Sequence, residues 1–292
     1  MRFRPVDLVS NFSEAHLHIF TTILTLVLPI LTAFYIYNDY LAFLSLGKGG
    51  TPSTPLGYLK IKTLSLVSLR DPYRPLPIPP HFRPQKGYLR SLPRRVTRRP
   101  LVQGIAPQRQ QTQKSSEKLY AQLVARLQSL ARDPRNMLME RTSCFEKHSS
   151  GLFATLPITR TCGGEVCHAH PSDGSLHLTL HPADAKLVLE HGLGERHPLA
   201  KGGWYRRFVP REFVLIYAPR SEEEVDVVMR IVAAAVWWVS GVDVNAGDGE
   251  GEGRRRSADV AAIGKAMEGS GCGVCKVHAC GGTPAEKMTG DA

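Results

Sequence analysis

Residues 165–180 read EVCHAHPSDGSLHLTL, and this stretch decides the fold that the sequence predicts. Its side chains alternate on either side of Asp173-Gly174, a dipeptide typical of the two-residue type I′ turn of a β-hairpin. A two-residue turn fixes the register of the two strands and places His170 opposite His177. The sequence therefore predicts an antiparallel hairpin with histidines on both strands.

One face of this hairpin gathers the histidines. Because alternate residues of a strand share a face, His168, His170 and His177 point the same way, whereas Glu165 falls on the opposite face and is not expected to be a ligand. Opposed Cβ atoms lie about 5 Å apart, so three imidazoles can meet around one ion or one bound molecule. Neutral imidazoles suit zinc, iron or copper, and without a metal they supply acid–base groups. The alternative is that the three side chains are merely solvated.

The sequence around the hairpin predicts helices and strands that pack on it. Apolar residues recur with helical spacing over 117–132, and Ser221 with Glu224 forms the capping box of a second long helix. That helix ends at about Val239 in an apolar run (IVAAAVWWV), which predicts a buried core helix, with a helix resting on a membrane as the alternative. The remaining predicted elements are strands at 137–146, 151–156 and 213–218 and a helix opened by Pro182 and closed by Gly192. The predicted fold class is α+β, one small mixed domain with packing helices.

A membrane segment precedes this domain. The nineteen residues from Ile19 to Tyr37 (IFTTILTLVLPILTAFYIY) carry no charge. At about 1.5 Å per residue, they cover close to the roughly 30 Å of hydrocarbon in a bilayer. A long leader precedes the run and no small-x-small cleavage motif follows it, which favours an uncleaved anchor over a signal peptide. We expect a single transmembrane helix in contact with membrane lipid, and a domain on the cytosolic side.

The net charge of +11 comes from one stretch of the chain. Residues 72–116 hold ten Lys or Arg and no Asp or Glu. With few aromatics for base stacking, this stretch does not predict nucleic-acid binding; it fits either attraction to anionic lipid or a solvated connector. Eleven prolines between 52 and 107 exclude regular helices and central strands there.

These boundaries divide the chain into an N-terminal flank (1–18), a transmembrane helix (19–40), a Pro/Arg-rich connector (41–114), the α+β domain (115–241) and a disordered Gly-rich tail (242–292). The six cysteines form no even framework. In the tail, a C-x2-C motif with one further Cys and one His is a weaker candidate zinc set: Cys272, Cys275, His278 and Cys280.

Beyond the hairpin, Arg196 and His197 follow a Gly-bounded loop, where the pair could reach an anionic or enolic substrate. The alternative for Arg196 is structural, in an ion pair with Glu195 or Asp184. The functional prediction from these residues depends on the three hairpin histidines sharing one face. If they did not, the residues alone would predict no chemical function.

Three stretches resemble the luciferase-domain family of fungi, which includes the enzyme of luminous mushrooms. They are EVCHAHPSDGSLHLTLHPADAKLVLEHGLGERHPLA at 165–200 with FVLIYAPRSEEEVDVV at 213–228, and upstream RRPLVQGIAPQRQQTQ at 98–113 is similar to the family's Pro-Gln-Arg-Gln segment. The likeness spans about residues 85–240. Carried over by position, the motif residues are His168 and His170, His177, and the block Glu195, Arg196 and His197.

The resemblance implies an oxygen-dependent enzyme. Luminous members of the family add O2 to a 3-hydroxylated styrylpyrone, lose CO2 and release an excited product, with no established metal or organic cofactor. Two positions depart from the family pattern: Leu193 stands for the usual Trp and Lys201 for a common Gly. The expected function is a membrane-anchored luciferase-like oxygenase with catalytic residues His168, His170, His177, Arg196 and His197, acting on a flat enolic or phenolic molecule such as a hydroxypyrone. The alternative is a membrane-tethered module that binds a small molecule or a metal ion without turnover.

Overall fold

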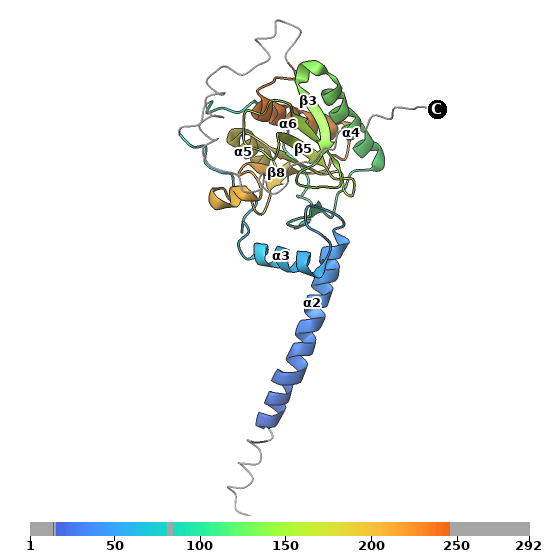
Figure 1. Ribbon diagram of the computed structural model, residues 1–292, viewed down its shortest axis with the longest axis vertical. Helices are drawn as coiled ribbons and strands as arrows, with labels where there is room; N and C mark the ends of the chain where they lie inside the picture. Colours follow the sequence, from blue (N-terminus) through green and yellow to red (C-terminus); the bar gives the residue numbers. More distant parts are fainter. Residues whose placement is uncertain (1–13, 15, 81–83, 246–292) are drawn as a thin grey trace, which may run out of the picture.

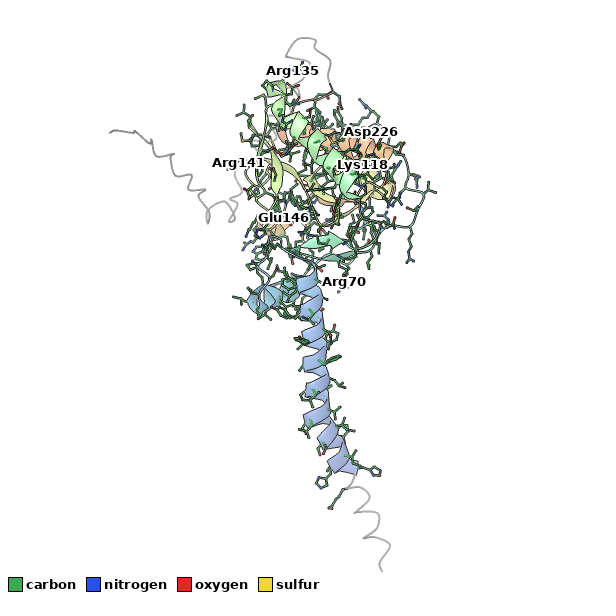
Figure 2. All side chains as sticks on the ribbon, turned by 90° about the vertical axis from the view of Figure 1, so that its right-hand side faces the viewer. Arg70, Lys118, Arg135, Arg141, Glu146 and Asp226 are labelled. Atoms are coloured by element: carbon green, nitrogen blue, oxygen red, sulfur yellow. The ribbon has the colours of Figure 1, made fainter. Side chains whose placement is uncertain are left out.

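A folded domain stands at one end of a long helix in the computed structural model, which describes residues 14, 16–80 and 84–245 (Figure 1). The long helix runs from His16 to Ser45 and includes a π-helical turn, η1 (Ile23–Val27), followed by α2 (Leu28–Ser45). Its most apolar stretch of 18 residues has a mean hydropathy of 2.2 and is not buried. The helix is therefore long and apolar enough to cross a membrane. Its side chains stand out on all sides (Figure 2). The candidate zinc set and the predicted tail, apart from residues 242–245, lie outside the described residues.

The domain is built on a six-stranded antiparallel sheet with the strand order β3-β4-β5-β6-β8-β7. Helices α4 (Glu117–Arg132) and α6 (Glu222–Ser240) cover one face of this sheet, and α5 (Pro182–Glu190) packs near β7 (Figure 1). The strands are β3 (Leu138–Thr142), β4 (Ser150–Ala154), β5 (Glu165–Ala169), β6 (Leu176–Thr179), β7 (Gly194–Arg196) and β8 (Phe213–Ile216). The fold class is α+β, as predicted from the sequence.

Alternation along the strands separates two environments. Leu176 and Leu178 of β6 join the core between the sheet and α4 and α6, whereas His177 between them points to the other face. The same core buries the apolar end of α6, so the prediction of a buried helix over IVAAAVWWV is confirmed. A second, smaller cluster on the other side of the sheet joins Phe43 of α2, Ile61 and Phe213.

The long helices begin where their caps predict. Ser116 accepts a hydrogen bond from the backbone N–H of Leu119 at the start of α4, and Ser221 accepts one from the N–H of Glu224 at the start of α6. The Glu224 carboxylate in turn accepts a hydrogen bond from the N–H of Arg220, which completes the capping box one residue upstream of its usual place.

The prediction that residues 47–107 contain no regular helix was wrong, whereas the prediction that they contain no central strand agrees with the structure. The structure has helix α3 (Pro55–Ser65) there, and the short strand β1 (Val102–Gly104) pairs with β2 (Gln108–Gln110). Helix α3 forms because Thr54 caps it, Pro55 occupies its first turn, where no N–H is needed, and no proline follows until Pro72. Short 3-10 turns complete the described elements: η2 (Pro134–Asn136) and η3 (Gly203–Arg207).

The Pro/Arg-rich segment is held against the domain by specific polar contacts. The Asp184 carboxylate of α5 accepts hydrogen bonds from the backbone N–H groups of Tyr88 and Leu89, at 2.9 and 2.8 Å. The Arg99 guanidinium donates to the carbonyls of Leu189 and Gly194. Part of the predicted connector is therefore built into the surface of the folded domain, while the division of the chain into domains stays a prediction.

Replacement of Asp184 tests this attachment. Asp184→Ala removes a buried acceptor shared by two backbone donors, and we expect the free energy of unfolding to fall by about 2–3 kcal/mol. The matched control is Glu190→Ala on the same helix, which removes only an exposed pair with Lys186 and costs about 0.5 kcal/mol or less. Denaturant titration of the detergent-solubilised protein measures both, and equal losses would contradict this account.

Candidate functional site

The hairpin closes through a longer loop than the sequence predicts. His168 pairs with His177, and the N–H of His170 donates to the carbonyl of Ser175, so four residues form the loop and the predicted two-residue turn was wrong. The Asp173 side chain accounts for the difference, because it accepts hydrogen bonds from the N–H groups of Ser175 and Gln110. The register shifts by two residues, an even number, so every side chain keeps its predicted face.

The structure brings the three hairpin histidines together. The ring centroid of His168 lies 5.3 Å from the centroid of His170 and 5.3 Å from that of His177. The ring centroids of His170 and His177 lie 4.8 Å apart. All three side chains are buried, and one nitrogen from each lies within 4.8 Å of the others. The cluster is thus a desolvated group of imidazoles and not a set of solvated side chains, while its catalytic role stays a prediction.

A β-bulge adds a carboxylate that the sequence reading placed on the wrong face. Leu152 pairs with Cys167 but Phe153 pairs with Glu165, so Val166 is an extra residue and Glu165 turns towards the histidines. Oε1 of Glu165 lies 2.6 Å from Nδ1 of His168. The carboxylate also accepts hydrogen bonds from the hydroxyl of Ser143 and the N–H of Cys144, at 2.6 and 2.7 Å.

This carboxylate fixes the tautomer of His168. A carboxylate bound to Nδ1 holds the proton there, so Nε2 keeps its lone pair. Among the described residues, Nε2 of His168 has no hydrogen-bond partner. It is therefore the nitrogen available to take a proton from a bound molecule.

The rings of His170 and His177 belong to a chain of hydrogen bonds that runs from Ser175 to Glu195. Nδ1 of His170 lies 2.9 Å from the hydroxyl of Ser175, and Nε2 lies 3.1 Å from Nδ1 of His177. Nε2 of His177 lies 2.9 Å from Oε1 of Gln108, whose amide donates to Glu195 at 3.1 Å. Both ring nitrogens of His170 and His177 are thus engaged. The sequence reading missed Gln108, although it lies in the Pro-Gln-Arg-Gln segment that carried part of the resemblance.

Burial sets the protonation of this chain. Desolvation lowers the pKa of His170 and of His177 well below the usual range, and it raises the pKa of Asp173. A neutral imidazole donates from one nitrogen and accepts at the other, so His177, which donates from Nε2 to Oε1 of Gln108, accepts at Nδ1 from Nε2 of His170. The Ser175 hydroxyl, next to Nδ1 of His170, donates to the Asp173 carboxylate at 2.6 Å.

His168 and His177 line a cavity of about 240 Å³, and His197 lines it beside them. Its walls are partly aromatic: the His177 ring stacks on Phe213 with centroids 5.0 Å apart, and the Phe145 ring also packs on Phe213, with centroids 4.6 Å apart. His170 stands behind His177 and does not line the cavity. Three exposed basic residues lie among the lining residues and mark the mouth: Lys60, Lys147 and Arg207.

Arg196 and His197 are neighbours at the edge strand β7, but their side chains point to opposite faces of the sheet. Nε2 of His197 donates to the carbonyl of Ile105 at 2.9 Å, and Nδ1 accepts from the N–H of Leu199, so both nitrogens are occupied. The Arg196 guanidinium does not line the cavity and donates to the carbonyls of Arg74 and Ala200. The structure therefore brings His197 to the histidine cluster and does not bring Arg196 there. The contacts of Arg196 are structural, with partners other than those expected.

The three hairpin histidines are also the set that could hold a metal ion. A zinc ion bound by imidazoles at about 2.0–2.1 Å would need one free nitrogen from each ring. His168 offers Nε2, but both nitrogens of His170 and of His177 are hydrogen-bonded. A metal ion would have to replace a hydrogen bond at each of these two rings, and metal binding stays a prediction.

The sequence of the chain is similar to those of known proteins. Residues 163–235 match the luciferase domain. The chain is 32% identical over 225 residues to the luciferase of Armillaria mellea, with 70% of this chain and 82% of that protein covered. It is 33% identical over 224 residues to the luciferase of Neonothopanus nambi, with 70% and 81% covered.

The chain belongs to the fungal luciferase-domain family. The matched luciferase domain begins two residues before Glu165 and therefore includes the bulge and the whole histidine hairpin, but not Gln108. No solved structure matches the chain.

The burial of His197 makes the stability of this luciferase-family domain depend on pH. Desolvation lowers the pKa of His197 from its ordinary value of 6.5 to about 4. Below pH 6.5 the unfolded chain takes up a proton that the folded domain refuses, so stability falls as the pH drops from 6.5 towards 4, by about 3 kcal/mol for this group. His170 and His177 act in the same direction.

His197→Asn keeps a donor and an acceptor but does not titrate, and we expect it to reduce the loss of stability between pH 7 and pH 4.5 by about 2 kcal/mol. Denaturant titrations at the two pH values measure this difference. His148→Asn, at an exposed position, is the control and should leave the loss unchanged. An identical pH dependence in His197→Asn and the unmodified protein would refute the assignment.

Proposed function

We propose that the chain is a membrane-anchored luciferase-like oxygenase that acts on a flat enolic or phenolic small molecule, such as a hydroxypyrone. Membership of the luciferase-domain family supports a luciferase-like function. The observation that carries the proposal is the pair formed by Glu165 and His168 at the wall of a cavity with aromatic sides. The helix from His16 to Ser45 supports the anchor.

In the first step, Nε2 of His168 takes the proton of the substrate hydroxyl. The Glu165 carboxylate, bound to Nδ1, stabilises the imidazolium that forms and keeps the ring in place. The flat substrate ring packs against Phe213 and Phe145, which exclude water from it. The resulting enolate is electron-rich and is the species that adds O2, the second substrate.

The charge of this enolate needs partners within the cavity. Arg196 was expected to offset it, but its guanidinium is occupied by carbonyls outside the cavity. Among the lining residues, Arg207 and the lysines at the mouth are cations, and the N–H of His177 can turn from Gln108 towards an oxyanion. The hydrogen-bonded chain behind His177 holds that ring and limits where it can turn.

A second candidate function, a membrane-tethered module that binds a small molecule or a metal ion without turnover, draws on the same three imidazoles. Oxygen uptake separates the two functions, because a binding module consumes none. The most direct trial is a set of hydroxylated pyrones with oxygen uptake and photon counting recorded together.

Removal of the base tests the enzyme function. His168→Gln should lower the rate of oxygen consumption by about 10²–10⁴-fold, since general-base catalysis contributes about that much. His148→Gln, at an exposed position, is the control and should retain the full rate. An active preparation whose rate is unchanged by His168→Gln would exclude the proposed role of His168.

Replacement of the positioning carboxylate should have a smaller effect. Glu165→Gln keeps the size of the side chain but removes its charge, and we expect a rate about 10–100-fold lower. The loss should appear in the rate per folded molecule, because the uncharged amide holds the His168 ring less firmly than the carboxylate does. A purely structural role would lower the amount of folded protein and leave the rate per folded molecule unchanged.

A further inference from the structure

Helix α3 exposes an apolar face that no other described part of the chain covers. Leu56 and Leu59, with Leu66 just after the helix, lie at helical spacing on one side and are 77%, 60% and 84% exposed. The opposite side buries Gly57 and Ile61 against the domain. Two exposed leucines on one short helix, with a third directly after it, are unusual in water and typical of a helix that lies in a membrane interface.

Asp39 of α2 fixes the position of α3 along the axis of the long helix. The hydroxyl of Tyr58 donates to the Asp39 carboxylate at 2.6 Å, and Lys62 forms an ion pair with the same carboxylate. Asp39 is the first charged residue after the uncharged run at 19–37. Helix α3 runs sideways from the upper end of α2 (Figure 1). Its contacts with Asp39 therefore place it at the level where the hydrocarbon of a bilayer would end.

The same helix forms part of the cavity mouth. Lys60 and Leu64 of α3 are among the residues that line the cavity next to His168. On the buried side, Ile61 packs in the cluster that contains Phe213 of the cavity wall. The position of α3 therefore also sets the position of the mouth.

We infer that the outer face of α3 rests in the headgroup layer of the bilayer that α2 crosses, and that the cavity mouth opens onto this bilayer. The inference rests on the anchoring by α2 in the proposed function. Exposed basic residues beside the leucines match an anionic lipid surface: Lys60 and Lys62 on α3, and Lys147 and Arg207 across the mouth. A flat apolar substrate dissolved in the bilayer then reaches His168 without crossing water.

Lipid crosslinking in nanodiscs tests this arrangement with the full-length protein. A photo-crosslinking amino acid replaces Leu59 on the apolar face or Lys147 at the mouth, in discs of phosphatidylcholine and phosphatidylserine. Leu31 on α2 serves as the positive control, and Leu156, which is 64% exposed on the domain, is the matched negative control. Mass spectrometry should find lipid-sized mass shifts at positions 31, 59 and 147 and none at 156.

The controls separate the inference from the function on which it rests. Lipid adducts at position 31 without adducts at position 59 would overturn the placement of α3 in the headgroup layer and would still support the anchor. Adducts at 59 without adducts at 147 would overturn the opening of the mouth onto the bilayer. The absence of adducts at 31 would overturn the anchoring itself, and with it the inference.

Discussion

The burial of four imidazoles is the constraint on which the rest of the structure depends. A buried ring nitrogen without a partner is costly, so each ring needs acceptors and donors brought from elsewhere in the chain. Glu165 comes from a bulge in β5, Ser175 follows the hairpin loop directly, and Gln108 comes from β2. The carbonyl of Ile105 completes the partners of His197. Segments far apart in the sequence must therefore pack together before the histidines can leave water.

The gathering of the histidines could be predicted from the sequence because it depends only on parity. Residues 168, 170 and 177 share a face under any register that differs by an even number, and the four-residue loop changed the register by two. The role of Glu165 could not be predicted in this way, because one extra residue at Val166 reverses the face of everything before it. Arg196 shows the converse: with β7 recognised as a strand, alternation would have placed it away from Glu195 and His197.

The Pro/Arg-rich segment was the least predictable part, because its order comes from tertiary contacts and not from local propensity. Its prolines argue against long elements, and they do not reveal that Gln108, Arg109 and Gln110 are buried. Arg109 forms a buried ion pair with Glu146, and Arg99 binds backbone carbonyls, so part of the basic surplus serves internal contacts. A charge count along the chain cannot distinguish these arginines from solvated ones.

The second core cluster has a consequence for the long N-terminal helix. Phe43 near the end of α2 is buried in the same cluster as Ile61 of α3 and Phe213 of β8, and Phe213 stacks on His177 in the cavity. Because cores are closely packed, removal of Phe43 leaves a void next to the cavity wall that its neighbours fill by moving. The end of α2 is thus part of the fold that shapes the site, and the proposed anchor cannot be treated as a detachable tether.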